Sequence, residues 1–382
     1  MKITHALGHN SNWSIESYHE QQIGDYFLII AFNHGMKFLT KPAFRDIKEI
    51  SMIDLQFYGK KNNKGKLGEF SFHPANCSSL DVTNVYFDNC IKEAIEFQRG
   101  NGFRNIIIPH YYDNEEVDGI ISTIKKINNY VKTLQKGNER YFMTLPFANH
   151  IIIDKDKVET ILFECTDQNI CFDGFYIVCE NKPEFRRKVT TELKILKNLT
   201  KVLKTLKDQN FKTIYSYANW DAVLFLTKTD IDYITIGNYE NLRNFDIKRF
   251  TEDESGGGSK GYYYSEKLLN MIRADDLTQI RETNNLQLIK NDKNIFSDII
   301  IREGYPWNIH KPEVNKNFFL AYSRLLEDVA GINDLSLRKQ FMSEKIEKAN
   351  QIYDILEQKG VYLDKESSNY HLNIWRTYLN IE

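Results

Sequence analysis

The sequence predicts a (β/α)8 TIM-like barrel with a helical C-terminal extension, and three observations lead to this fold class. Short runs rich in β-branched and aromatic residues recur along the chain, amphipathic helical patterns separate most of them, and several runs are apolar throughout. Strands without polar alternation are typical of parallel sheets, whose two faces are both covered. Strands that alternate with helices favour right-handed βαβ units, and eight of them favour a barrel. An open doubly wound sheet is the competing architecture.

The predicted strands share high β-propensity and a polar or glycine-containing end. They are 25–32, 50–58, 104–109, 140–146, 174–180, 212–217, 232–237 and 260–265. Helices are predicted at 81–99 and 114–136, where apolar residues recur at spacings of three and four, and from Pro183 to Leu206. The stretch 59–80, which contains GKKNNKGKLGE, is expected to be an exposed excursion.

The pattern changes near residue 282, where strand signals give way to helices. We therefore predict a barrel domain at 1–281 and a helical extension at 282–382, with helices in 315–331, 334–360 and 367–380. The extension either packs under the barrel or binds a protein partner.

Bulk composition excludes several function classes. The 382 residues are 42% hydrophobic and 27% charged, which is ordinary for a globular protein, and the net charge of −2 gives no global attraction to nucleic acid. The longest apolar run, at 26–32, is too short for a membrane span, and the N-terminus shows no signal-peptide pattern. Five cysteines without a C-x-x-C pair favour reduced thiols, so a cytoplasmic protein is expected. No metal or cofactor is expected, since no H-x-H follows the first predicted strand.

Asp54 and Glu180 are the candidate catalytic carboxylates. Each lies within or at the end of an apolar strand, where a carboxylate is costly to bury unless it is paired or used. Two carboxylates that face one cavity can divide acid and nucleophile roles, as in glycoside-cleaving enzymes. The alternative is that each caps a loop or bonds a neighbouring Lys or Arg. His34 and His110 are candidate general bases because they follow predicted strands, although a histidine in a loop more often only hydrogen-bonds.

Polar and aromatic residues at the carboxyl ends of barrel strands line the ligand mouth. The candidate substrate-binding residues chosen on this ground are Asn33, Gln56, Ser216, Tyr217, Trp220, Gly237 and Asn238. A second set, Gly256, Gly257, Gly258, Ser259 and Lys260, precedes the predicted eighth strand, and its backbone N–H groups could hold an anion. The alternative for this second set is a flexible loop.

A basic stripe is expected opposite the leucines of the third predicted helix. Its candidate partner-binding residues are Arg186, Arg187, Lys194, Lys197, Lys201 and Lys204. They are either the solvated face of a barrel helix or a surface for nucleic acid or an acidic protein.

The stretch DYITIGNYENL, followed by a glycine-rich segment, resembles the last third of tRNA-guanine transglycosylase-type barrels. The resemblance covers about a quarter of the chain and depends on spacing, and the zinc-binding cysteine cluster of that family has no counterpart here. It implies base exchange or cleavage at an N-glycosidic bond with an aspartate nucleophile; Asp54 does not map onto a family motif.

Two hypotheses follow from the sequence. The first is a barrel enzyme that acts on a glycosidic or phosphate-bearing, nucleoside- or nucleotide-like substrate by carboxylate catalysis. The second is a non-catalytic barrel that binds a ligand or partner within a nucleic-acid-related or bacterial defence assembly.

Overall fold

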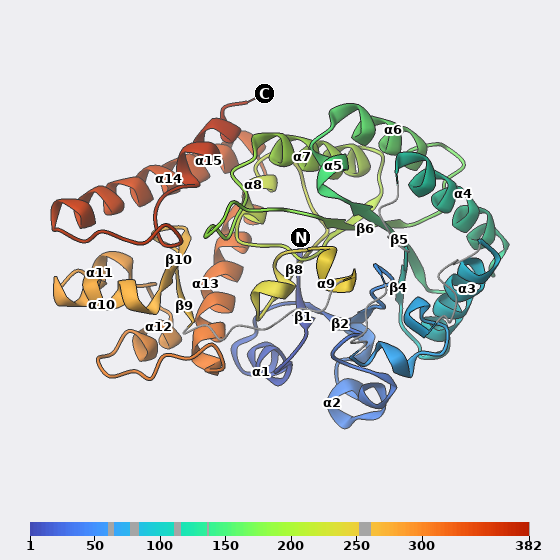
Figure 1. Cartoon of the computed structure of the whole chain (residues 1–382), viewed down its shortest axis with the longest axis horizontal. Coiled ribbons are helices and arrows are strands. Elements are labelled where there is room, and N and C mark those ends of the chain that lie inside the picture. Colours follow the sequence, from blue (N-terminus) through green and yellow to red (C-terminus); the bar gives the residue numbers. More distant parts are fainter. Residues whose placement is uncertain (60–64, 77–83, 111–115, 136, 252–260, 382) are drawn as a thin grey trace.

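The chain folds around a nearly closed barrel of parallel strands with helices on its outside (Figure 1). A computed structural model describes residues 1–59, 65–76, 84–110, 116–135, 137–251 and 261–381. Eight strands form one sheet in the order β3-β2-β1-β8-β7-β6-β5-β4. Their bounds are β1 Lys2–Leu7, β2 Tyr26–Ile30, β3 Ser51–Asp54, β4 Asn105–Ile108, β5 Arg140–Phe147, β6 Gly174–Cys179, β7 Lys212–Tyr215 and β8 Tyr233–Gly237. The predicted fold class of a (β/α)8 barrel is therefore confirmed.

The strands are buried on both faces, as their composition predicts. All residues of β4 (NIII) and β6 (GFYIVC) are buried, because one face lines the barrel interior and the other packs under helices. On β6, Phe175 packs its ring on Phe211, which follows α7, with centroids 5.1 Å apart. The hydroxyl of the adjacent Tyr176 instead reaches Asp54 of β3. Successive residues of this strand thus point alternately toward the outer helices and toward the barrel interior.

Two of the strand predictions need correction. The first barrel strand is β1, which the sequence reading missed, so the predicted strand at 25–32 is the second in the barrel. The predicted eighth strand does form, as β9 (Tyr262–Ser265), but it pairs antiparallel with β10 (Asn270–Arg273) in a separate two-stranded sheet. β1 closes the place that β9 was expected to take, since it pairs with both β2 and β8.

Helices follow most of the barrel strands. They include α1 (Asn12–Gln21), α3 (Asn84–Gly100), α4 (Val117–Thr133), α6 (Lys155–Cys165), α7 (Leu193–Asp208) and the short α8 (Ala222–Phe225). α7 begins ten residues after the predicted start at Pro183, at Leu193, where the Glu192 side chain accepts a hydrogen bond from the Lys194 N–H and caps the helix. The segment before it is a loop, in which Arg186 has a left-handed backbone with φ 62°.

The connection between β3 and β4 is less exposed than predicted. Among its described residues, Leu67, Phe70, Phe72 and His73 are buried, and Phe70 and Phe72 pack on Phe97 of α3. β3 and β4 lie against each other, but within the described residues they share no hydrogen-bonded ladder. Among the described residues, the cylinder thus has a seam between β3 and β4 where the strands lie close together without backbone pairing.

The extension lies on one side of the barrel (Figure 1). The long helix α13 (Pro312–Gly331) contacts both the β9–β10 hairpin and the barrel helices α1 and α8, while α14 (Leu335–Gln358) and α15 (Leu372–Leu379) complete the extension. The α15 residue Tyr378 shares a 2.6 Å hydrogen bond with Thr200 of α7. The extension is therefore packed onto the barrel through several elements.

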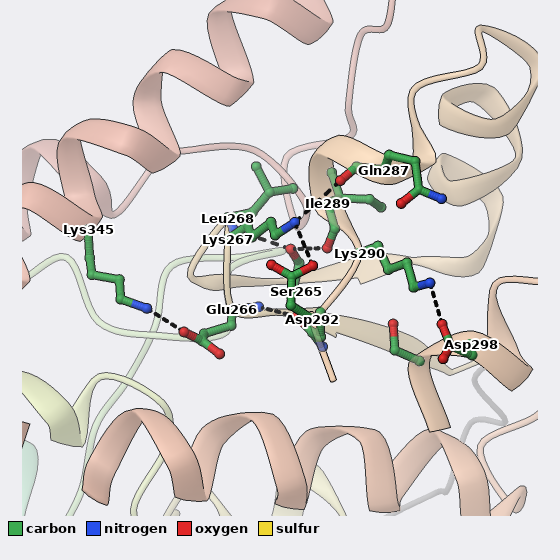
Figure 2. Close-up of polar contacts among 12 residues, drawn as sticks. Ser265, Glu266, Lys267, Leu268, Gln287, Ile289, Lys290, Asp292, Asp298 and Lys345 are labelled. Atoms are coloured by element: carbon green, nitrogen blue, oxygen red, sulfur yellow. Dashed lines mark hydrogen bonds and ion pairs between the residues drawn. The ribbon is translucent and has the colours of Figure 1, made fainter. Parts of the chain in front are cut away.

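Polar contacts fix the turn of the β9–β10 hairpin (Figure 2). Ser265 Oγ donates to the Ile289 carbonyl at 2.7 Å, and Lys267 Nζ bonds Asp292 at 3.1 Å. Glu266 forms an ion pair with Lys345 of α14. The hairpin is thereby tied to the end of α11 (Leu286–Ile289), to the residues just after it, and to α14. Across the described residues, no helix is long and apolar enough to cross a membrane.

Candidate active site at the barrel mouth

The carboxylate of Asp54 lies at the centre of the barrel mouth and accepts hydrogen bonds from three elements. Tyr176 of β6 donates to Oδ2 at 2.9 Å, and Tyr217, just after β7, donates to Oδ2 at 3.1 Å. Tyr58 lies 3.2 and 3.3 Å from the two carboxylate oxygens, and the Gln56 N–H donates to Oδ1 at 2.9 Å. These contacts place Asp54 at the barrel axis.

Further hydroxyl and amide groups are directed at the same carboxylate. An ionised carboxylate only accepts hydrogen bonds, so the Tyr176 proton points to Asp54. Ser216 must then donate to Tyr176 (2.7 Å), and Thr235 of β8 donates to Ser216 (3.2 Å). In parallel, Gln56 Nε2 donates to the Tyr217 hydroxyl at 2.9 Å. The predicted site residues Asp54, Gln56, Ser216 and Tyr217 thus form one network.

Two residues of this network have an unusual backbone. Gln56 and Tyr217 lie in the left-handed region, with φ of 54° and 52°. Residues other than glycine are disfavoured in this region, and such conformations persist when the surrounding structure holds them. Each residue lies two positions after the end of a strand, Gln56 after β3 and Tyr217 after β7. The unfavourable backbone thus accompanies the placement of the Gln56 N–H and the Tyr217 hydroxyl against Asp54.

Two phenylalanines from the connection after β8 cover the network. The ring of Phe245 lies 4.9 Å from that of Tyr58 and 5.3 Å from that of Tyr217, and Phe250 lies 5.0 Å from Tyr58. Figure 1 shows α9 (Lys248–Thr251), which contains Phe250, across the middle of the ring of strands. Asp54 is in consequence only 2% exposed.

Burial raises the pKa of Asp54 to about 6, although the hydrogen bonds from Gln56, Tyr176, Tyr217 and Tyr58 act in the opposite direction. The same burial, together with the Asp54 charge, raises the pKa values of Tyr58 and Tyr176 well above the ordinary range. The tyrosines therefore stay protonated and act as donors. A carboxyl group that titrates near pH 6 can both accept and release a proton at neutral pH.

Glu180 has a different environment from Asp54. Its carboxylate accepts from the Asn149 N–H at 2.9 Å and from the Ile247 N–H at 3.4 Å, and Lys182 lies 3.5 Å away. It therefore joins the connections after β5 and β8, which is the loop-capping alternative considered above. Its backbone forms a bridge with Phe245, so Glu180 also supports the phenylalanine that covers Asp54.

The candidate histidines occupy the same end of the barrel. His34 bonds the Gly8 carbonyl at 3.0 Å and stacks obliquely on Phe38, and burial lowers its pKa to about 4. It is consequently uncharged at neutral pH. Asn33 precedes it, with its N–H bonded to the Ile30 carbonyl. His110 is buried two residues after β4.

Gly237 and Asn238 shape the turn after β8. A Cβ on Gly237 would lie 2.2 Å from Leu242 Cβ, so a side chain is excluded there by packing. Asn238 accepts a 2.9 Å hydrogen bond from Ser14 and donates to the carbonyls of His9 and Asn10. Both residues therefore stabilise the rim. The predicted anion-binding set Gly256, Gly257, Gly258, Ser259 and Lys260 lies outside the described residues.

Trp220 and Asp221 form a second buried polar group after β7. Trp220 is buried against Tyr264, with ring centroids 6.4 Å apart, and its Nε1 has no hydrogen-bond partner among the described residues. Asp221 Oδ1 is likewise without a partner in that part of the chain, and burial raises the pKa of Asp221 to about 7. Trp220 thus faces the β9–β10 hairpin, since Tyr264 belongs to β9.

The basic stripe of α7 is largely compensated within the chain. Lys201 pairs with Glu159, and Lys204 with Asp208 at 2.7 Å. In the preceding loop, Arg187 pairs with Glu184 at 2.7 Å, and Arg186 approaches Asp364 at 3.9 Å. Lys194 and Lys197 lie on the first two turns of the same helix.

Tyr58 and Tyr176 are the site residues that the sequence reading missed. Both lie in predicted strands, where an aromatic residue is ordinarily interpreted as part of the apolar core. The available signal is chemical, because a buried tyrosine hydroxyl needs a partner, and a tyrosine in a fully buried strand implies a polar acceptor nearby. Within the described residues, no group of three or more His, Cys, Asp or Glu side chains is arranged to hold a metal ion.

No protein-family model matches the chain, and no curated protein matches its sequence. The class that fold and site define is a (β/α)8 barrel with a buried aspartate and tyrosine network at its mouth.

Proposed function

We propose that the protein is a cytoplasmic barrel enzyme acting on a glycosidic or phosphate-bearing, nucleoside- or nucleotide-like substrate. Asp54 is the reacting carboxylate, as a general acid–base or as a nucleophile. Glu180 is a positioning residue that holds the connections around the site. The location supports this proposal, because catalytic groups of barrel enzymes lie at the carboxyl ends of the strands, and Asp54 is the last residue of β3.

The environment of Asp54 is the observation that carries the proposal. A carboxylate buried among three tyrosine hydroxyls, with its pKa raised to about 6 by burial, has the proton affinity that acid–base catalysis near neutral pH needs. The donors also hold its orientation, which a nucleophile requires. Purely structural carboxylates more often pair with Lys or Arg, and the hydrogen-bond partners of Asp54 described here are all uncharged.

The phenylalanine rings that cover Asp54 determine which part of the chain must move to admit a substrate. With Phe245 and Phe250 in place, Asp54 is buried. A substrate that reaches the carboxylate must displace the connection after β8, as lids of barrel enzymes do. Glu180 accepts the Ile247 N–H and supports the closed position.

A second candidate function is a non-catalytic barrel that binds a ligand or partner, within a nucleic-acid-related or bacterial defence assembly. The same observations favour it in one respect, because Asp54 already has four hydrogen-bond donors and a closed aromatic cover. The exposed Leu335 and Leu337 at the start of α14 would then belong to a partner surface on the extension.

Metabolite profiling separates the two functions. Purified protein is incubated with cell extract and with a panel of nucleosides and nucleotides, and substrate loss is followed by mass spectrometry. We expect loss with wild type and with the exposed-carboxylate control Asp208→Asn, but not with Asp54→Asn. If no metabolite is lost from any sample, while wild type retains a bound ligand, the non-catalytic binding function is favoured.

A further inference from the structure

A pocket of about 270 Å³ lies between the barrel rim and the extension, apart from the Asp54 network. Its walls come from Lys188 after β6, from the turn Asn238–Arg243 after β8, from the hairpin residues Tyr262 and Met271, and from Phe318 of α13. Barrels commonly hold phosphate groups near the ends of their last strands. The position and the size of this pocket therefore suit a small charged group.

Arg243 supplies the first cation. Its Nη1 donates to the carbonyls of Gly237 and Asn238 at 3.1 and 2.8 Å, and the guanidinium lies 4.8 Å from the centre of the Phe318 ring. Its Nε is buried without a hydrogen-bond partner among the described residues. Among the described residues, no carboxylate hydrogen-bonds this guanidinium, so its positive charge is not neutralised by a direct partner.

The electrostatics of Arg243 agree with this geometry. Burial lowers the pKa of the guanidinium to about 10, and the negative charge of Glu240 only partly opposes this effect. The group is still charged at neutral pH, so it carries its charge in a poorly solvated place. An anion in the pocket would relieve that cost.

Lys188 supplies the second cation. Its side chain is 16% exposed, its Nζ lies 2.9 Å from Glu240, and it sits 4.9 Å from the centre of the Tyr262 ring. The backbone N–H of Lys188 donates to Tyr370, and its carbonyl accepts from Asn219. These bonds fix the residue between the rim and the extension. Glu240, the carboxylate among the lining residues, is half exposed and acts on both cations, so one negative charge of the lining faces two positive charges.

We propose that this pocket binds the phosphate group of a small phosphate ester, between Lys188 and Arg243. The lining itself carries two cations and one carboxylate, and therefore a net positive charge. Glu366, which accepts from the Tyr262 hydroxyl and also acts on Lys188, lies outside the lining. The adjoining Tyr262 and Phe318 rings can pack on the rest of the ligand. That the ester is nucleotide-like rests on the proposed function, whereas binding of phosphate does not require Asp54 to react.

Titration calorimetry at fixed ionic strength tests the proposal, with inorganic phosphate and adenosine monophosphate as probes. Lys188→Gln should weaken binding by roughly tenfold, the effect of one charge-assisted hydrogen bond. Glu240→Gln should tighten it several-fold, because the competing carboxylate loses its charge. Lys204→Gln, which removes an equal charge on the outer face of α7, should bind as wild type does. Arg243→Lys keeps the positive charge but removes the planar guanidinium with its several N–H donors, and it should bind more weakly than wild type.

The outcomes separate the possible errors. Tighter binding of the nucleotide than of phosphate assigns the pocket to the ester, and equal binding assigns it to the free anion. The proposal is overturned if neither phosphate nor the nucleotide binds. It is also overturned if Lys188→Gln and Lys204→Gln weaken binding equally. Asp54→Asn should bind both probes normally; retained binding without any turnover by wild type would contradict the proposed reaction but not the pocket.

Discussion

Gln56 and Tyr217, far apart in the chain, meet across the barrel mouth, where the Gln56 amide donates to the Tyr217 hydroxyl at 2.9 Å. Both have a left-handed backbone, and both also donate to Asp54, Gln56 through its N–H and Tyr217 through its hydroxyl. The pair thus links the ends of β3 and β7 through one carboxylate.

Loss of the Tyr217 hydroxyl should cost more stability than loss of the Tyr58 hydroxyl. Tyr217→Phe leaves the buried Gln56 amide without its acceptor, which typically costs ~1–3 kcal/mol. Tyr58→Phe removes only the longer 3.2 and 3.3 Å contacts with Asp54. Urea unfolding of the two variants measures the difference. A larger loss for Tyr58→Phe would show that the Gln56 contact does not stabilise the fold.

Asp54→Asn should remove a pH dependence of stability. The folded-state pKa of Asp54 is about 6 against an ordinary value of 3.8, so the folded protein binds more protons at this group between those values. Stability contributed by the protonated form is therefore lost as pH rises from about 4 to above 6, by roughly 3 kcal/mol. Between pH 4.5 and 7.5, the unfolding free energy of the variant should rise relative to that of wild type by roughly 2 kcal/mol of this total. A constant difference would contradict the raised pKa.

Asp221→Asn should stabilise the protein at alkaline pH. Burial raises the pKa of Asp221 to about 7, and one of its oxygens has no partner among the described residues. Above pH 7 the folded state holds a poorly compensated charge, which costs up to roughly 4 kcal/mol relative to the protonated group. Thermal unfolding at pH 5 and pH 9 provides the comparison. We expect a gain for the variant at pH 9 and little change at pH 5.

Gly237→Ala should disrupt the turn after β8. The new Cβ would lie 2.2 Å from Leu242 Cβ and 2.9 Å from the Leu242 carbonyl oxygen, so the backbone must shift, at a cost of ~1–3 kcal/mol or more. Leu242→Ala cannot rescue the variant, since alanine keeps both clashing atoms. Gly331→Ala is the matched control, because its Cβ would meet nothing within 4 Å. Unfolding midpoints of these variants give the answer, and rescue by Leu242→Ala would refute the close approach.

Local sequence patterns predicted the barrel because strand composition and helix periodicity are local properties. Seven of the barrel strands, β2 to β8, coincide with predicted runs, although β5 extends one residue further, to Phe147. β1 escaped because its interior carries Thr4 and His5, which read as polar although both are buried and His5 bonds the Ile23 carbonyl. The run at 260–265 has strand propensity, but which sheet a strand joins depends on distant partners, and β9 pairs with β10 instead.

The candidate site was predictable only in part. Asp54, Gln56, Ser216 and Tyr217 stand out as polar or aromatic residues at strand ends, and the structure brings them together. Glu180 has the same local signature, yet it binds loop N–H groups, because the direction of a side chain is set by packing. Arg243 and Lys188 have no local signature at all, since their pocket exists only where the extension meets the rim.

The unpaired seam gives the cylinder two free edges. Among the described residues, β3 lacks backbone pairing on the side toward β4, and Asp54 is its final residue. Hydroxyls from the opposite wall therefore supply support that a neighbouring strand would ordinarily provide. A change in the protonation of Asp54 therefore alters the hydrogen bonds that join the end of an edge strand to the opposite wall.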